Sequence, residues 1–161
     1  MTMSASAPDG ELAERLARCY TGVVYDVLRA RGIVDCILPP TIVPLDRDMA
    51  CAGPVFTVRG RPDATVSPHE TLLRWTELLS RAPKGHVVMV EGHDSVRALM
   101  GELSAETLQC RGVRGYIVDG LGKIIFFAAC SGCRHMNPPY LHLIHSHTQR
   151  YQQNVVNLSL I

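Results

Sequence analysis

Apolar residues recur at helical spacing in two segments near the start of the chain. Residues 9–20 and 23–32 are therefore predicted to be helices, and the second ends where Gly32 follows an arginine. A short segment at 42–45 and an alternating segment at 52–59 have the composition of strands. The first third of the chain is thus predicted to contain two helices followed by two strands.

The clearest helix start in the sequence is at Ser67. Serine is a preferred N-cap, Pro68 fits the first helical position, and Glu70 is spaced to complete a capping box. The predicted helix ends at residues 83–85, where proline and glycine occur. Residues 87–90 are continuously apolar and are predicted to form a strand buried on both faces.

Residues 101–123, which read GELSAETLQCRGVRGYIVDGLGK, are predicted to form a helix, a tight turn and a strand. The helix begins at Gly101 and closes at Gly112, and the strand ends at Asp119. Because strands alternate with helices over most of the chain, the predicted fold class is α/β.

The start of this helix is the candidate site. The first amides of a helix have no intrahelical acceptor and carry partial positive charge, so a carboxylate could bind the amides of residues 101–104. Glu102 is a candidate general base, and Lys123 lies just past the strand end as a candidate cation. The alternative is an ordinary helix–strand unit with a glycine at its turn, which is a common pattern.

Composition narrows the possible functions. The chain has 161 residues, 47% of them hydrophobic, and a formal net charge of +1 without a basic stripe, which argues against a nucleic-acid partner. The polar start and the lack of a long apolar run predict neither a secretory signal nor a membrane anchor. Six cysteines without the spacing of a disulfide framework favour a reducing, cytoplasmic location.

Three segments carry a resemblance to a known family. GPVFTV, KGHVVMVEG and GELSAETLQCRGVRGYIVDG occur in the order, and with the gaps, that are typical of the RraA-like family. The family includes class II 4-hydroxy-4-methyl-2-oxoglutarate aldolases and regulators of ribonuclease E activity. The resemblance covers roughly residues 12–122, so residues 1–122 are the predicted RraA-like domain and 123–161 a divergent tail.

The resemblance implies a swivelling β/β/α layered domain that assembles as a homotrimer with sites between neighbours. It also implies a lyase that cleaves 4-hydroxy-4-methyl-2-oxoglutarate to pyruvate, decarboxylates oxaloacetate as a side activity, and uses Mg²⁺ or Mn²⁺. The implied substrate-binding residues are Gly101, Glu102, Leu103, Ser104 and Lys123, and Glu102 and Lys123 are the implied catalytic residues. The alternative is a non-catalytic regulatory or binding member, or an inactive truncated paralogue.

The sequence departs from the family directly after the strand. In the family an Arg-Asp pair follows, in which the arginine binds substrate and the aspartate holds the metal. Here the pair is Lys123 and Ile124. Lysine keeps the charge without the bidentate fork, and isoleucine cannot ligate a metal. No metal ligand is therefore assigned, and impaired activity is expected.

The sequence leaves two explanations of the tail at 123–161 open. A deletion could have removed the Arg-Asp pair and its helix, or a shifted reading frame or retained intron could have produced the tail. In either case the domain would be incomplete at its C-terminal end, and the chain could be a poorly folding gene product. Cys130 and Cys133, with histidines downstream, form a zinc-like pattern, although a poorly packed tail is the simpler interpretation.

Overall fold

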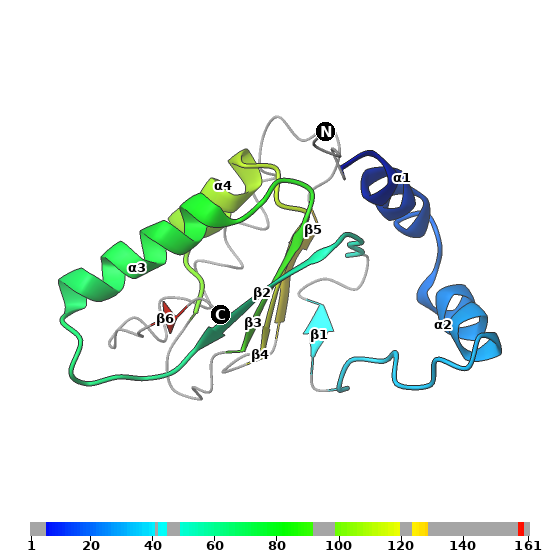
Figure 1. Cartoon of the computed structure of the whole chain (residues 1–161), viewed down its shortest axis with the longest axis horizontal. Helices are drawn as coiled ribbons and strands as arrows, with labels where there is room; N and C mark the ends of the chain where they lie inside the picture. Colours follow the sequence, from blue (N-terminus) through cyan, green and yellow to red (C-terminus); the bar gives the residue numbers. More distant parts are fainter. Residues whose placement is uncertain are drawn as a thin grey trace, which may run out of the picture.

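The computed structural model describes residues 6–40, 42–44, 49–91, 99–119, 124–128 and 158–159. Within these residues the fold is α/β, as predicted, and the strands form one sheet with the order β1-β5-β4-β3-β2-β6 (Figure 1). The elements in chain order are α1 (Ser6–Leu16), α2 (Thr21–Ala30), β1 (Val43–Pro44), β2 (Val55–Gly60), α3 (Pro68–Arg81), β3 (Val87–Glu91), α4 (Glu102–Cys110), β4 (Gly115–Asp119), β5 (Ile124–Ala128) and β6 (Leu158–Ser159).

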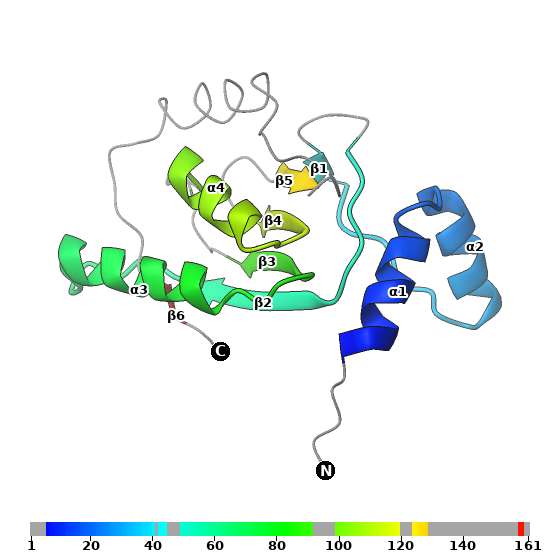
Figure 2. The same ribbon diagram turned by 90° about the horizontal axis from the view of Figure 1, so that it is seen from above.

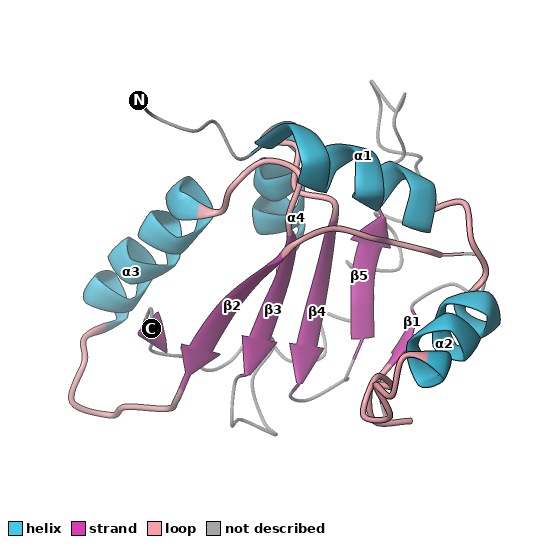
Figure 3. Cartoon of the chain, turned by 45° about the vertical axis from the view of Figure 1, so that its right-hand side comes forward, coloured by secondary structure: helices cyan, strands magenta, loops and turns pink. Residues whose placement is uncertain are grey.

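The centre of the sheet is a parallel unit in which β2, β3 and β4 are joined by the crossover helices α3 and α4. The register aligns Val55 with Val87, and Val87 with Gly115, so the three strands begin and end together. Figures 1 and 2 show α3 and α4 on one side of the sheet and α1 and α2 on the other. The carboxyl ends of β3 and β4 therefore lie at one edge of the sheet (Figure 3), and β4 is the strand after which Lys123 was predicted to contribute to the site.

The hydrophobic core lies between the central strands and the α3–α4 layer. Strand residues that alternate along β2, β3 and β4 point into it, which agrees with the period of two in a strand. Leu78 on α3 and Leu108 on α4 are almost fully buried against them, and Tyr116 is completely buried. The buried strand residues of this cluster are Val58, Val88, Val90, Tyr116 and Val118.

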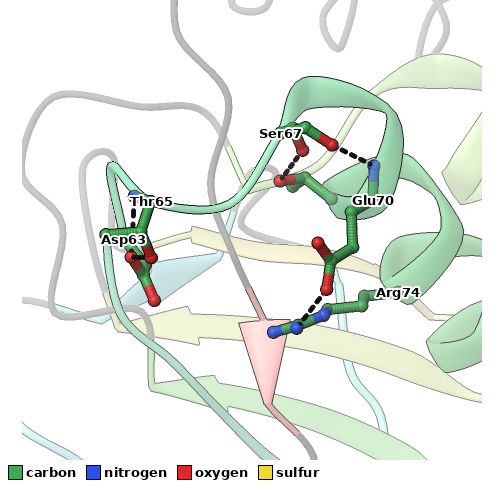
Figure 4. Close-up of polar contacts among 6 residues, drawn as sticks. Asp63, Thr65, Ser67, Glu70 and Arg74 are labelled. Atoms are coloured by element: carbon green, nitrogen blue, oxygen red, sulfur yellow. Dashed lines mark hydrogen bonds and ion pairs between the residues drawn. The ribbon is translucent and has the colours of Figure 1, made fainter.

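The start of α3 follows the predicted cap, with one difference. The Ser67 side chain accepts a hydrogen bond from the Glu70 amide at 3.1 Å, so the N-cap is confirmed (Figure 4). The Glu70 carboxylate pairs with Arg74 one turn further along the helix. Because Arg74 carries a charge, it is a stronger partner for this carboxylate than a neutral backbone amide.

Strand β5 lies within the predicted tail, and its backbone belongs to the sheet. It pairs antiparallel with β4 and parallel with β1. Only residues 120–123 connect β4 to β5, and a parallel pairing would need a crossover of about a dozen residues or more. A connection this short therefore requires β5 to pair antiparallel with β4. The strands of the parallel unit, by contrast, are joined by helical crossovers. The boundary at residue 122 stays a prediction.

Helices α1 and α2 make few contacts with the sheet. Ala13 is the buried residue of α1, and α2 has no buried residue. Arg114, which precedes β4, joins α1 to the sheet by pairing with Glu14 and donating to the carbonyl of Ala52 at 3.4 Å. Across the described ranges, none of the helices has both the length and the apolar character needed to cross a membrane.

Candidate functional site

Helix α4 begins as the sequence predicts, directly after Gly101. This residue is the N-cap, with an extended backbone (φ −128°, ψ 169°), and its carbonyl accepts the Ala105 amide at 3.0 Å. Residues 102–104 form the first helical turn, so their amides have no acceptor within the helix. The helix dipole adds partial positive charge at this end, so an anion is favoured there.

The backbone and the surroundings of Gly101 leave room for a larger residue. Its φ is one that any residue adopts, and a Cβ atom built there meets no atom within 4 Å. By contrast, Gly112 at the other end of α4 has a φ of +76°, and a Cβ atom there would lie 3.0 Å from the Lys84 side chain. Glycine is therefore needed at the end of α4 by conformation, whereas at its start it leaves open space beside the amides.

The segment before α4 is fixed to the sheet by a buried hydrogen bond. The hydroxyl of Tyr116 in β4 donates to the carbonyl of Leu99 at 2.8 Å, and both residues are buried. The start of α4 is thereby held within reach of β4, the strand that ends at Asp119. Burial raises the pKa of the Tyr116 hydroxyl, so this group remains a hydrogen-bond donor at neutral pH.

The three predicted residues that follow Gly101 at the helix start have different surroundings. The Ser104 hydroxyl accepts a hydrogen bond from the indole nitrogen of Trp75 on α3 at 2.7 Å. Leu103 is 79% exposed, and Glu102 is half-buried. The contact between Ser104 and Trp75 was not predicted, because 29 residues separate the two and no local pattern indicates such a pairing.

The predicted cation and the metal position can be followed only in part. Lys123 lies outside the described residues, as do the cysteines and histidines of the zinc-like pattern. Ile124 is the first residue of β5, and its backbone pairs with Val43. An aliphatic residue offers no oxygen ligand, so this position does not fit a divalent metal. Among the described residues there is also no group of three or more His, Cys, Asp or Glu side chains that could hold a metal.

A polar pair that sequence reasoning missed lies at the carboxyl edge of the parallel strands. Arg59 near the end of β2 pairs with Glu91 at the end of β3, with a distance of 2.6 Å. In the register Glu91 also aligns with Asp119 of β4. Arg59 follows the buried residue Val58, so the pair lies on the sheet face opposite α3 and α4. The sequence does contain a signal for this pair, because a charged residue occurs at the end of each of these two strands.

Comparisons with known proteins agree with this architecture. A family model described as RraA-like, Aldolase/RraA, matches residues 21–122. A solved structure, described as that of novel cellulases from microbes associated with the gut ecosystem, is similar with 30% identity and a TM-score of 0.60. The similarity covers 70% of this chain and 50% of that one, so the chain spans about half the length of that protein. No curated protein has significant similarity to the chain. The match over residues 21–122 includes α2 to β4, and the chain belongs to the RraA-like family.

Proposed function

We propose that the first turn of α4 binds the carboxylate of a small 2-oxo acid such as pyruvate. The observation that carries this proposal is the open space around the N-cap Gly101, which immediately precedes amides that lack intrahelical acceptors. This helix start lies within the residues that match the RraA-like family model. Resemblance to the family's class II aldolases supplies the class of ligand.

The chemistry proposed for this site is the formation of a pyruvate enolate. The amides of residues 102–104 would hold the substrate carboxylate, and the half-buried Glu102 would accept the proton of the 4-hydroxyl group as the C3–C4 bond breaks. One pyruvate then forms with its new carbonyl at C4, and the other leaves as the enolate and takes up a proton. Lys123 would place a positive charge near the developing enolate. In the family, Mg²⁺ or Mn²⁺ supplies further charge stabilisation, but Ile124 does not fit that metal.

We therefore propose a lyase of the class II aldolase type whose activity is impaired. Cleavage of 4-hydroxy-4-methyl-2-oxoglutarate and decarboxylation of oxaloacetate both need the enolate oxygen to be stabilised. Loss of a metal's charge would raise the barrier by several kcal/mol, which is a rate loss of about three orders of magnitude or more. Carboxylate binding by backbone amides depends less on the metal and is expected to remain.

The second candidate is a non-catalytic RraA-like protein that binds a small acid or a partner protein. It is favoured by Ile124, which stands where the family has its metal-binding aspartate. Ile124 is the first residue of β5, pairs with β1 and offers no oxygen ligand. For either candidate we propose the homotrimer that the resemblance implies, with the site between neighbours. The exposed side chain of Leu103, in the first turn of α4, suits such a boundary. Light scattering of the purified chain would test this assembly.

The binding proposal is tested by titrating pyruvate into the full chain and into Gly101→Val. The extended backbone at Gly101 accepts valine, and its Cβ meets no atom within 4 Å, so the variant should fold while the added methyl groups obstruct the amides. Gly10→Val is the matched control, because a Cβ atom at Gly10 also meets nothing within 4 Å. Binding that is equal in all three proteins would contradict the proposal.

A pyruvate-release assay with added Mg²⁺ or Mn²⁺ separates the two candidates. Slow turnover, with or without added metal, that is lost in Glu102→Ala would support the impaired lyase. Pyruvate binding without any turnover at high protein concentration would support the non-catalytic protein.

A further inference from the structure

Two aromatic side chains from different elements reach the start of α4. From the sheet side, the Tyr116 hydroxyl donates to the carbonyl of Leu99 at 2.8 Å. From the helix layer, the Trp75 indole N–H donates to the Ser104 hydroxyl at 2.7 Å. The segment between these two anchors includes Gly101 and the first helical turn.

We infer that Tyr116 and Trp75 are positioning residues, which hold the first turn of α4 in the orientation in which its amides bind a carboxylate. The inference rests on the proposed function of that turn and adds residues that set its affinity. Neither residue is placed in contact with the ligand. Both act through the backbone or side chain to which they donate.

The hydrogen bond from Tyr116 to the Leu99 carbonyl holds its geometry because water has no access to it. The tyrosine is completely buried and Leu99 is 7% exposed, so the carbonyl cannot exchange its partner for bulk water without an opening of the core. Leu99 lies only two residues before Gly101, so a shift of its carbonyl is passed directly to the N-cap.

The Trp75 anchor fixes the same turn from the other side. The indole ring packs against the core cluster, and its nitrogen acts only as a donor, so it has a single way to pair with Ser104. Ser104 is the third residue of α4, within the turn whose amides lack intrahelical acceptors. Because hydrogen bonds weaken steeply as their angle falls, a small rotation of this turn would lower its affinity for an anion.

An ordinary contribution to stability is the competing explanation, and a matched core variant separates the two. Tyr116→Phe and Trp75→Phe each remove one donor and keep an aromatic ring. Val113→Ala truncates a fully buried residue that follows α4 at its opposite end. It should lower Tm at least as much as either aromatic variant, while leaving the first turn in place.

The measurements are the Kd for pyruvate, from an NMR titration well below every Tm, and the hydrogen-exchange rate of the Ala105 amide, which donates to the Gly101 carbonyl at 3.0 Å and closes the first turn. We expect each aromatic variant to raise Kd about three- to tenfold and to speed exchange, while Val113→Ala changes neither. Unchanged Kd and exchange in both aromatic variants, or equal changes in Val113→Ala, would overturn the inference.

If the parent chain binds no pyruvate, the proposed function fails and the exchange rates alone decide the inference. Faster exchange at Ala105 in the aromatic variants, but not in Val113→Ala, would still support positioning of this turn by Tyr116 and Trp75. Equal exchange rates in all the proteins would overturn it.

Discussion

Two regions of the molecule, each built on amphipathic helices, bury their apolar residues to very different extents. In the parallel unit, residues 55–119, both helices pack on one face of the sheet, and Leu78 and Leu108 are almost fully buried. In the N-terminal arm, residues 6–38, α2 buries no residue, and Tyr20 and Ile37 are each more than 70% exposed. Figure 2 shows the arm beside the sheet, on the side away from α3 and α4.

The difference shows what hydrophobic periodicity specifies. A helical spacing of apolar residues predicts that a segment is a helix, and this was confirmed for both α2 and α3. The spacing does not predict whether the apolar face meets a partner within the same chain. In the parallel unit the crossover connections force each helix onto the sheet between its two strands, whereas α2 has no strand directly before it. Chain connectivity accounts for the contrast.

The largest expected effect tests this contrast with one alanine truncation in each region. Leu108→Ala removes a side chain that is 1% exposed and should lower the free energy of unfolding by about 2–5 kcal/mol. Val27→Ala in α2 removes one that is 49% exposed and should change it by less than about 1 kcal/mol. Urea unfolding of both variants, followed by circular dichroism, measures the two changes.

Equal losses in the two variants would contradict the comparison, because they would mean that α2 is packed in solution as tightly as α4. Since a partner copy could cover α2, the unfolding curves should be repeated over a range of protein concentrations. A loss in Val27→Ala that grows as concentration rises would indicate that the arm packs between chains.

The second prediction concerns pH and the buried tyrosine of the parallel unit. Burial raises the pKa of Tyr116 in the folded chain above the ordinary value of 10.0, so the folded state holds this proton more strongly than the unfolded state. The associated stability is complete below pH 10 and is lost as pH rises above it. Above pH 10 the loss should reach about 1.4 kcal/mol for each pH unit.

The comparison of the parent chain with Tyr116→Phe isolates this contribution. The difference between their unfolding free energies should be constant from pH 7 to pH 9 and should shrink above pH 10, because the phenylalanine cannot lose a proton. A difference that stays constant up to pH 11 would show that Tyr116 ionises equally in both states, and the prediction would be wrong.

The helices and strands of the parallel unit were predicted from the sequence because their signals are local. Ser67 and Pro68 mark the start of α3, and Gly112 with a positive φ marks the end of α4.

The contacts that hold the candidate site are not local. Tyr116 reaches Leu99 over 17 residues and Trp75 reaches Ser104 over 29 residues, so only the folded arrangement brings them together. The antiparallel pairing of β5 likewise depends on which neighbouring strand is available, which residues 124–128 alone do not specify.

A smaller effect is expected at the start of α3. Ser67→Ala removes the acceptor of the Glu70 amide and should cost about 1 kcal/mol of stability (Figure 4). The matched control is Ser80→Ala on the same helix, whose hydroxyl donates to the Thr76 carbonyl within the helix. Because that carbonyl already takes part in the helical hydrogen bonds, the control should change stability by less than about 0.5 kcal/mol. Chemical denaturation of the two variants makes the comparison, and a larger cost at Ser80 would refute it.

The smallest global effect is expected where the two regions are joined. Glu14 on α1 pairs with Arg114 of the parallel unit, whose side chain is 21% exposed. Glu14→Gln removes the charge and keeps the shape, so the global unfolding free energy should fall by less than about 1 kcal/mol. The local effect should be larger, because Ala13 is the buried residue among the described side chains of α1. Amide exchange along α1 should therefore quicken while that of β3 stays constant. Glu11→Gln on the same helix is the matched control for loss of a charge. Equal acceleration in the two variants would mean that the ion pair does not hold the arm. Acceleration in Glu14→Gln alone would show that the Glu14–Arg114 pair attaches the arm, which makes few contacts, to the parallel unit, which is held by its core.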